Sequence, residues 1–138
     1  MDDATPGRDR GKMAAAVSNA ILRIHSEHYG RGADRVRTTI KDDFVLTRLE
    51  DCFTVVEKKM VDEGAFTTVR ETRTMFQDWM RPRFTEIVED ATGRKVRAFF
   101  SQVSHDPDIA IELFFLSGGT ESSRDGGPPD LAGASSEG

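Results

Sequence analysis

The residues best suited to acid–base chemistry are His105 and Asp106, which are adjacent in the segment Ser104-His105-Asp106-Pro107-Asp108. Histidine titrates near neutral pH and a neighbouring carboxylate raises its pKa, so the pair could transfer protons or bind a polar ligand. Turn chemistry explains the same residues without a reaction, because Asp before Pro initiates turns and polar residues are expected at hairpin tips. We favour the turn explanation and keep His105 and Asp106 as candidate ligand-binding residues.

A second candidate site is the segment Gly30-Arg31-Gly32, which is followed closely by Arg35. Glycine-rich turns expose backbone N–H groups, and arginine binds oxyanions through paired hydrogen bonds. The segment lacks the spacing of a P-loop or of a dinucleotide-binding fingerprint. It would serve equally as the end of a helix, which we favour, and Arg31 and Arg35 remain candidate anion ligands.

Cys52 is the one cysteine among 138 residues, so an intramolecular disulfide and a multi-cysteine zinc site are excluded. No neighbouring motif supplies it with a catalytic base, and we expect a buried thiol. His25 and His28 have helical spacing but no clear third ligand. We therefore expect neither a metal site nor a cofactor.

The overall composition disfavours two classes of partner. A net charge of −5 disfavours nucleic-acid binding, which depends on clustered Lys and Arg. No apolar run approaches the roughly 20 residues that cross a bilayer, and the acidic start does not resemble a signal peptide. We expect a cytoplasmic protein that reaches a membrane, if at all, through a partner.

Helical and strand patterns follow one another in αββ-ααββ order. Periodic apolar residues, a capping box that begins at Thr54 and glycines at helix ends predict the helices, while alternating runs around polar turns predict two hairpins. The predicted helices span Met13 to Tyr29, Val55 to about Val61 and Phe66 to Thr92, with a kink or break near Pro82, and the hairpins span residues 35–50 and 94–116.

These elements predict an α+β domain of two layers over residues 12–116. Its four-stranded antiparallel sheet would consist of the two β-hairpins, with the helices packed on one face. The repeated order of helix, glycine, strand, turn and strand suggests an αββ duplication. Residues 1–11 are expected to form a disordered arm, and residues 117–138, rich in Gly, Ser and Pro, a disordered tail.

The second hairpin is apolar on both faces. We expect the face with Val96, Ala98 and Phe100 to pack under the helices and the opposite face to stay open. A large open apolar patch is typical of an interface, and it predicts a homodimer or a partner complex. The residues expected in this interface are Phe99, Val103, Phe114 and Leu116.

Three segments resemble the MpsC-like domain, a bacterial family named for a Na+-translocating, membrane-potential-generating system. They are the HYGRG turn (residues 28–32), the MFQDWMRPRF helix (residues 75–84) and the SQVSHDPD hairpin (residues 101–108). The resemblance extends over residues 12–116. It implies a small accessory or regulatory subunit, not an enzyme, that acts with membrane subunits of a cation- or bicarbonate-linked transport system.

Two other functions remain open. A small anion-binding or His/Asp-dependent enzyme would require His105, Asp106 and Arg31 or Arg35 to converge in a concave pocket. A nucleic-acid-binding regulator would require a contiguous basic face.

Overall fold

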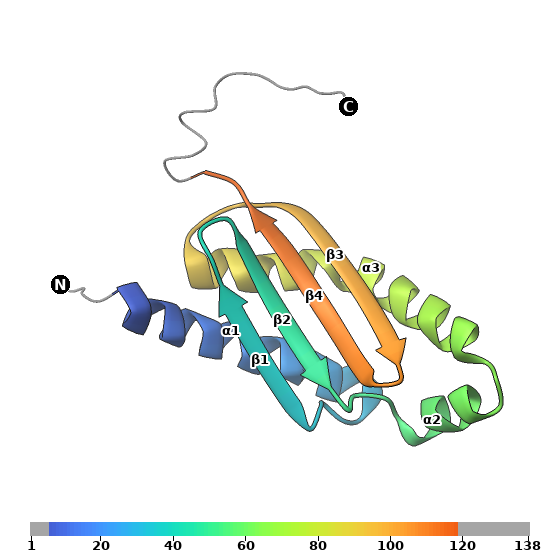
Figure 1. Ribbon diagram of the computed structural model, residues 1–138. Coiled ribbons are helices and arrows are strands. Elements are labelled where there is room, and N and C mark those ends of the chain that lie inside the picture. Colours follow the sequence, from blue (N-terminus) through green and yellow to red (C-terminus); the bar gives the residue numbers. More distant parts are fainter. Residues whose placement is uncertain (1–5, 119–138) are drawn as a thin grey trace.

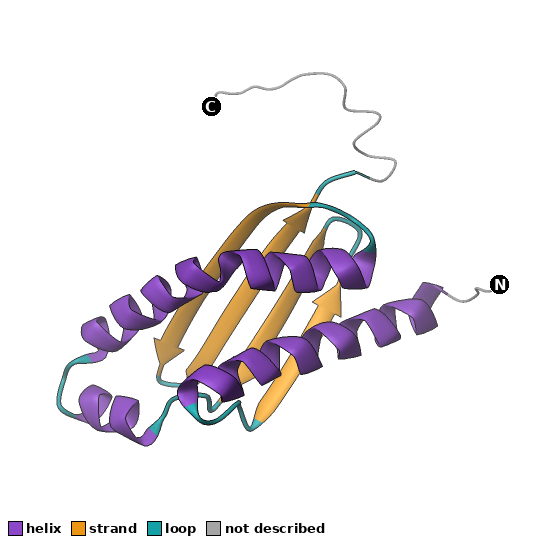
Figure 2. Cartoon of the chain, turned by 180° about the vertical axis from the view of Figure 1, so that it is seen from behind, coloured by secondary structure: helices purple, strands orange, loops and turns teal. Residues whose placement is uncertain are grey.

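Four antiparallel strands form one layer of the molecule, and the two long helices form the other (Figures 1 and 2). This computed structural model describes residues 6–118. In chain order the elements are α1 (Pro6–Tyr29), β1 (Arg35–Ile40), β2 (Phe44–Glu50), α2 (Val55–Asp62), α3 (Phe66–Thr92), β3 (Val96–His105) and β4 (Asp108–Leu116). The predicted α+β class, the αββ-ααββ order and the covering of one sheet face by helices are confirmed.

The strand order β1-β2-β4-β3 places the second strand of each hairpin at the centre of the sheet. Strands β2 and β4 pair antiparallel, with Thr47 opposite Glu112 at the middle of the register. Each αββ half thus contributes one edge strand and one central strand. This is the arrangement that an αββ duplication would produce.

Local signals predicted the helix ends well. Gly30 and Gly93 follow α1 and α3 with φ of 79° and 73°, a conformation that favours glycine and ends a helix. Thr54 and Glu57 form the predicted capping box at the start of α2. Helix α3 continues through Pro82 as one element, so the helix break that was considered near Pro82 does not occur.

The predicted N-terminal arm is wrong for residues 6–11, which belong to α1. Proline is well placed in a first turn, where its missing N–H is not needed, and Arg10 forms an ion pair of 2.9 Å with Asp42 in the β1–β2 turn. The disorder expected for residues 1–5 and 119–138 concerns residues outside the described part of the chain. Ser117, the first residue of the expected tail, is attached to the domain, because its N–H donates to the carbonyl of Lys95 at 2.8 Å.

The core lies between the sheet and the two long helices. From α1 and α3 it receives the predicted apolar stripes, and from the sheet one face of each strand. The buried apolar residues at its centre are Val17, Ile21, Ile24, Val45, Leu49, Cys52, Phe84, Val88, Phe99, Ala110, Phe114 and Leu116.

The helix-covered face and the open face of the second hairpin are the reverse of the sequence prediction, except at Val96, which packs against the core as expected. Phe99, Phe114 and Leu116 are buried under the helices and Val103 packs against them, so none of the four can form an open interface. Phe99 stacks on Phe114 with ring centroids 4.9 Å apart and contacts Phe84 of α3 at 6.0 Å. The alternation of side chains could not show which face of the hairpin meets the helices, because both faces are apolar. In addition, a register irregularity between Val96 and Ala98 shifts the alternation within β3.

Candidate functional site

Both arginines of the predicted anion site are held by the protein itself. Arg31 donates to the carbonyls of Asp51 at 2.6 Å and Phe53 at 3.4 Å and pairs with Asp34 at 3.0 Å. Arg35 pairs with Glu50 across the β1–β2 hairpin at 2.5 Å. Arg31 therefore fixes the segment after β2, and Arg35 strengthens the edge of the sheet.

His105 and Asp106 lie at the exposed tip of the β3–β4 hairpin. The ring of His105 packs on Phe66 at the start of α3, with centroids 4.3 Å apart, and Ser104 Oγ donates to the carbonyl of Pro107 at 2.7 Å. Within residues 9–118, no hydrogen bond or ion pair joins His105 or Asp106 to Arg31 or Arg35. The four predicted ligand residues are thus not brought together in one pocket.

Asp108 has the structural role in this turn. Its carboxylate accepts the backbone N–H of Cys52 at 3.2 Å and that of Phe53 at 3.0 Å, and thereby joins the start of β4 to the segment after β2. Cys52 is buried as predicted, and burial raises the pKa of its thiol to about 12. A thiol with that pKa stays protonated at neutral pH and is a poor nucleophile.

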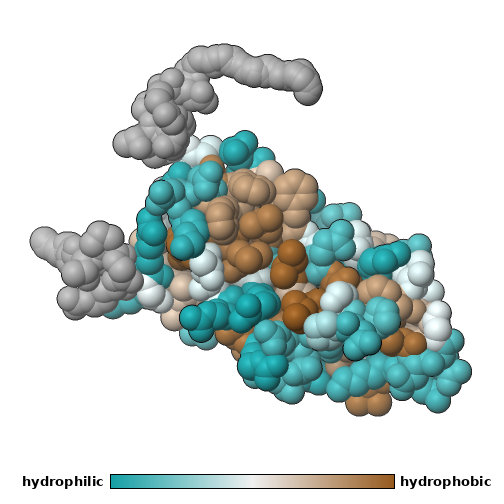
Figure 3. Space-filling model, viewed as in Figure 1, coloured by the Kyte–Doolittle hydropathy of each residue, from teal (hydrophilic) through white to brown (hydrophobic). Residues whose placement is uncertain are grey.

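The sheet face away from the helices is apolar over one end, and Figure 3 shows the patch from the side of Figure 1. Register places Phe44 opposite Phe115, and Leu46 opposite Leu113, which pairs in turn with Phe100. Phe100 is 55% exposed. We call the set of Phe44, Leu46, Ala98, Phe100, Leu113 and Phe115 the open apolar face.

The other end of the same sheet face is charged. Arg37 lies opposite Arg48, and Arg35 opposite Glu50. Glu50 also bonds Arg48 at 3.0 Å, and the hydrogen bond from Arg35 lowers the pKa of the Glu50 carboxyl. The sheet surface therefore changes from aromatic and aliphatic to charged along its strands.

A second polar group of residues is buried on the helix side of the sheet. Arg73 of α3 is 1% exposed and pairs with Glu57 of α2 through two bonds of 2.5 and 2.7 Å. It also donates to the carbonyl of Cys52 at 3.0 Å and lies over the ring of Tyr29 at 3.8 Å. Burial raises the pKa of Glu57, but bonds from Arg73 and Thr54 outweigh it and hold the pKa below its usual value.

Glu112 lies at the centre of the sheet beneath the helices and is fully buried. Burial raises its pKa to about 8, and the nearby Ser101 and Arg73 offset this effect in part. Neither carboxylate oxygen has a hydrogen-bond partner among residues 9–118. The carboxyl is therefore largely protonated at neutral pH.

His25, Tyr29 and Gln77 contribute further buried polar atoms. The Nδ1 atom of His25 bonds the carbonyl of Ile21 at 3.1 Å, whereas its Nε2 has no partner among residues 9–118. Burial lowers the pKa of His25 to about 4 and raises that of Tyr29. Both residues are uncharged at neutral pH as a result. We call the set of His25, Tyr29, Arg73, Gln77 and Glu112 the buried polar centre.

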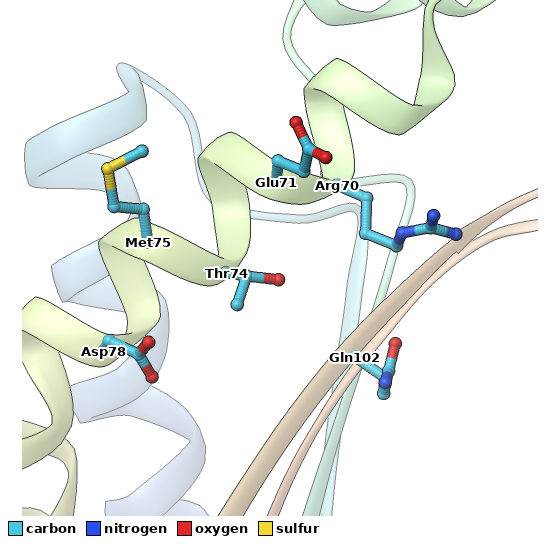
Figure 4. A pocket seen from close by; sticks show the side chains of 6 residues that line it. All are labelled: Arg70, Glu71, Thr74, Met75, Asp78 and Gln102. Atoms are coloured by element: carbon cyan, nitrogen blue, oxygen red, sulfur yellow. The ribbon is translucent and has the colours of Figure 1, made fainter.

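A shallow groove of about 390 Å³ lies between α3 and the edge strand β3. Figure 4 shows Arg70 and Thr74 reaching from α3 toward the strand that carries Gln102. The remaining walls are Glu71, Met75 and Asp78. This mixture of charged and flexible side chains shows no convergent arrangement for chemistry.

Sequence patterns identified part of the buried polar centre. Arg73 and Gln77 lie in phase with the buried apolar residues of α3, so helical periodicity is the signal that finds them. Alternation places Glu112 on the same strand face as Phe114 and Leu116, which was expected to stay open. The available signal was its position in phase with Phe114 and Leu116, which are also buried.

Comparison with known proteins identified one family. The family model described as "Na+-translocating membrane potential-generating system (MpsC)" matches residues 9–118. No curated protein and no solved structure matches the chain. Within residues 6–118, no helix is both long and apolar enough to cross a bilayer.

Proposed function

Because this chain belongs to the MpsC family, we propose that it is a non-enzymatic accessory or regulatory subunit of a membrane cation- or bicarbonate-linked transport system. In this proposal it assembles with a second copy of itself through the open apolar face. The observation that carries the proposal is that face, on which the ring of Phe115 contacts those of Phe44 and Phe100 at centroid distances of 6.3 and 6.1 Å. Figure 3 shows an apolar patch on this side of the sheet.

Physical chemistry favours burial of such a face. Contiguous apolar patches on soluble domains commonly mark association surfaces, and covering them contributes about 25 cal/mol per Å². The opposite side of the same sheet is already covered by α1 and α3 (Figure 2). A second layer on the open side would bury both faces of the β3–β4 hairpin from solvent.

A second copy fits this surface because a two-fold axis sets the same patch against itself. Aromatic and aliphatic side chains of one copy would then contact aromatic and aliphatic side chains of the other. The charged end with Arg37, Arg48 and Glu50 would lie toward the rim of the interface. Interfaces commonly have an apolar centre and a polar rim. The sheet has both parts in adjoining rows.

The test is the molar mass in solution, measured by light scattering over a range of protein concentrations. We expect a dimer for the natural chain and a monomer for Phe100→Arg, whose charge would have to enter the interface. Trp79→Arg is the matched control, because Trp79 is an exposed aromatic residue on α3, 71% accessible, and its replacement should leave the dimer intact.

Two results would overturn the dimer. One is a natural chain that stays monomeric at every concentration, and the other is a Phe100→Arg variant that remains dimeric and folded by circular dichroism. The transport role has its own test, in which a photo-crosslinking residue at position 102, beside the apolar face, is used in native cells. Adducts with an integral membrane protein would support that role, and adducts with soluble proteins alone would contradict it.

A further inference from the structure

Strand β3 forms one edge of the sheet, and its strand neighbour in the described chain is β4. It is ten residues long, from Val96 to His105. The outer backbone groups of an edge strand have no partner within the sheet, and an additional strand can bind to them. The residues of β3 that face outward can be identified from the hydrogen bonds of its neighbour.

Hydrogen bonding in β4 shows which of its residues face β3. The N–H of Leu116 donates to the carbonyl of Asp43, next to β2, at 2.8 Å. The direction of backbone groups alternates along a strand, so Leu113 and Phe115 direct theirs toward β3. Their register partners in β3 are Phe100 and Ala98. Even-numbered residues of β3 from Ala98 onward therefore bond to β4, and odd-numbered residues direct their N–H and C=O groups outward.

The carbonyl of Phe99 agrees with this direction, because it accepts a hydrogen bond of 3.5 Å from Arg81 on α3. Ser101 and Val103 follow in the same phase along β3, so their backbone groups also point away from β4. No hydrogen bond within residues 9–118 engages these outward groups of Ser101 and Val103. The middle of the β3 edge is therefore free to pair with an incoming strand.

The groove between α3 and β3 lies beside these free groups. Arg70, Thr74 and Asp78 line it at intervals of four residues, which places them in one row along α3 (Figure 4). Gln102, between Ser101 and Val103, lines the opposite wall. Several peptide-binding domains take up an extended segment as an added strand at a sheet edge, where main-chain bonds give affinity and flanking side chains give specificity.

The row on α3 is positive at one end and negative at the other. Phe66, one turn before Arg70, stacks on His105 with ring centroids 4.3 Å apart, so Arg70 lies toward the end of β3. Asp78 lies toward the beginning of β3, where it pairs with the exposed Arg81 at 3.5 Å. Arg70 forms no ion pair within residues 9–118 and is exposed. A bound segment would therefore meet opposite charges at its two ends.

We propose that this groove binds an extended peptide segment of a partner protein, which pairs with β3 as a fifth strand of the sheet. Arg70 and Asp78 are about 12 Å apart along the helix axis, and four residues of an extended chain span about 13 Å. A strand antiparallel to β3 begins near Arg70 and ends near Asp78. The segment therefore carries an acidic residue and, four positions later, a basic residue, with a small β-branched residue between them opposite Thr74.

This surface is separate from the one proposed for the dimer. The open apolar face lies on the side of the sheet away from the helices, whereas the groove lies between the sheet edge and α3. Main-chain bonds to Ser101 and Val103 would hold the segment, and the two charges would set its direction. Peptide binding therefore adds a second kind of partner to the chain and does not require a second copy.

The test uses the full chain and two capped synthetic peptides of equal composition, TETVTKT and TKTVTET, in titrations followed by NMR. We expect the acid-first peptide TETVTKT to bind about tenfold more tightly, because the other order replaces two exposed ion pairs by repulsions. Its binding should protect the N–H groups of Ser101 and Val103 from hydrogen exchange. Arg70→Glu combined with Asp78→Lys, both at exposed positions, should reverse the preference. Arg83→Glu, at a half-exposed position elsewhere on α3, should leave it unchanged.

The proposal is overturned if neither peptide binds at roughly 1 mM, if both bind equally, or if the double variant keeps the preference of the natural chain. Protection that appears on the open apolar face or on α1, and not along β3, would also overturn it. The two proposed surfaces fail separately. A monomeric chain that binds the acid-first peptide would refute the dimer alone, and a dimer that binds neither peptide would refute the groove alone.

Discussion

At the scale of single residues, Arg73 joins α3 to three other parts of the described chain. Its guanidinium is buried, and it reaches α2 through Glu57, the segment after β2 through Cys52, and α1 through the ring of Tyr29. A buried ion pair adds little net stability compared with apolar residues, but loss of one partner leaves a charge without compensation. Replacement of Arg73 should therefore lower the stability of the fold, because it would leave the Glu57 carboxylate without its cation.

We expect Arg73→Met to lower the free energy of unfolding by about 3–5 kcal/mol, because Glu57 would keep its charge in a largely buried position. Urea denaturation measures this change. Arg81→Met on the same helix is the control, since Arg81 is half exposed and should lose less than about 1 kcal/mol. Equal effects of the two substitutions would contradict the role given to Arg73.

At the scale of elements, the β3–β4 hairpin has one face in the core and one in the open. Phe114 is fully buried against Phe99, whereas Phe100 lies 55% exposed on the other side of the same ladder. Neighbouring residues in a strand point to opposite faces, so Phe100 points away from the face on which its neighbour Phe99 pairs with Phe114. A substitution on the helix side reports folding, and one on the open side reports association.

Phe114→Ala should therefore lower the free energy of unfolding by about 3–5 kcal/mol, as expected for removal of a buried aromatic ring. Phe100→Ala should lower it by less than about 1 kcal/mol in a dilute, monomeric sample. Chemical denaturation with each variant decides the point. A larger effect at position 100 than at position 114 would mean that the two faces are assigned the wrong way round.

At the scale of the whole molecule, buried titratable groups make folding depend on pH. The pKa of His25 is lowered from 6.5 to about 4 and that of Glu112 is raised from 4.5 to about 8. Below pH 6.5 the unfolded chain binds a proton at His25 that the folded chain excludes. Above pH 4.5 the folded chain retains a proton at Glu112 that the unfolded chain releases. The two effects oppose each other between these values.

Between pH 6.5 and 8 the effect of Glu112 stands alone. The folded state holds the proton and the unfolded state does not, so stability should fall as the pH rises, by up to about 1.4 kcal/mol per unit. Denaturation curves at a series of pH values measure the slope. Glu112→Gln should remove it. A natural chain whose stability is constant or rises over this interval would contradict the raised pKa of Glu112.

Most of the fold followed from local chemistry. Gly30 and Gly93 end helices because glycine tolerates positive φ, the Thr54 to Glu57 capping box begins α2, and polar turns join strands whose residues alternate. These signals act within a few residues, and for that reason they can be read from the sequence. The start of α1 was missed because Gly7 and Gly11 weaken a helical pattern without preventing a helix.

The sequence by itself thus determined the elements, their order and the family of this chain. The tertiary structure alone decided which hairpin face meets the helices, which partners Arg31 and Arg35 bind, and that His25, Gln77 and Glu112 are buried. The physical reason is that these outcomes depend on residues far apart in the chain. Two apolar faces satisfy the same alternation equally well, and a buried carboxyl is tolerated only where the surrounding fold sets its protonation.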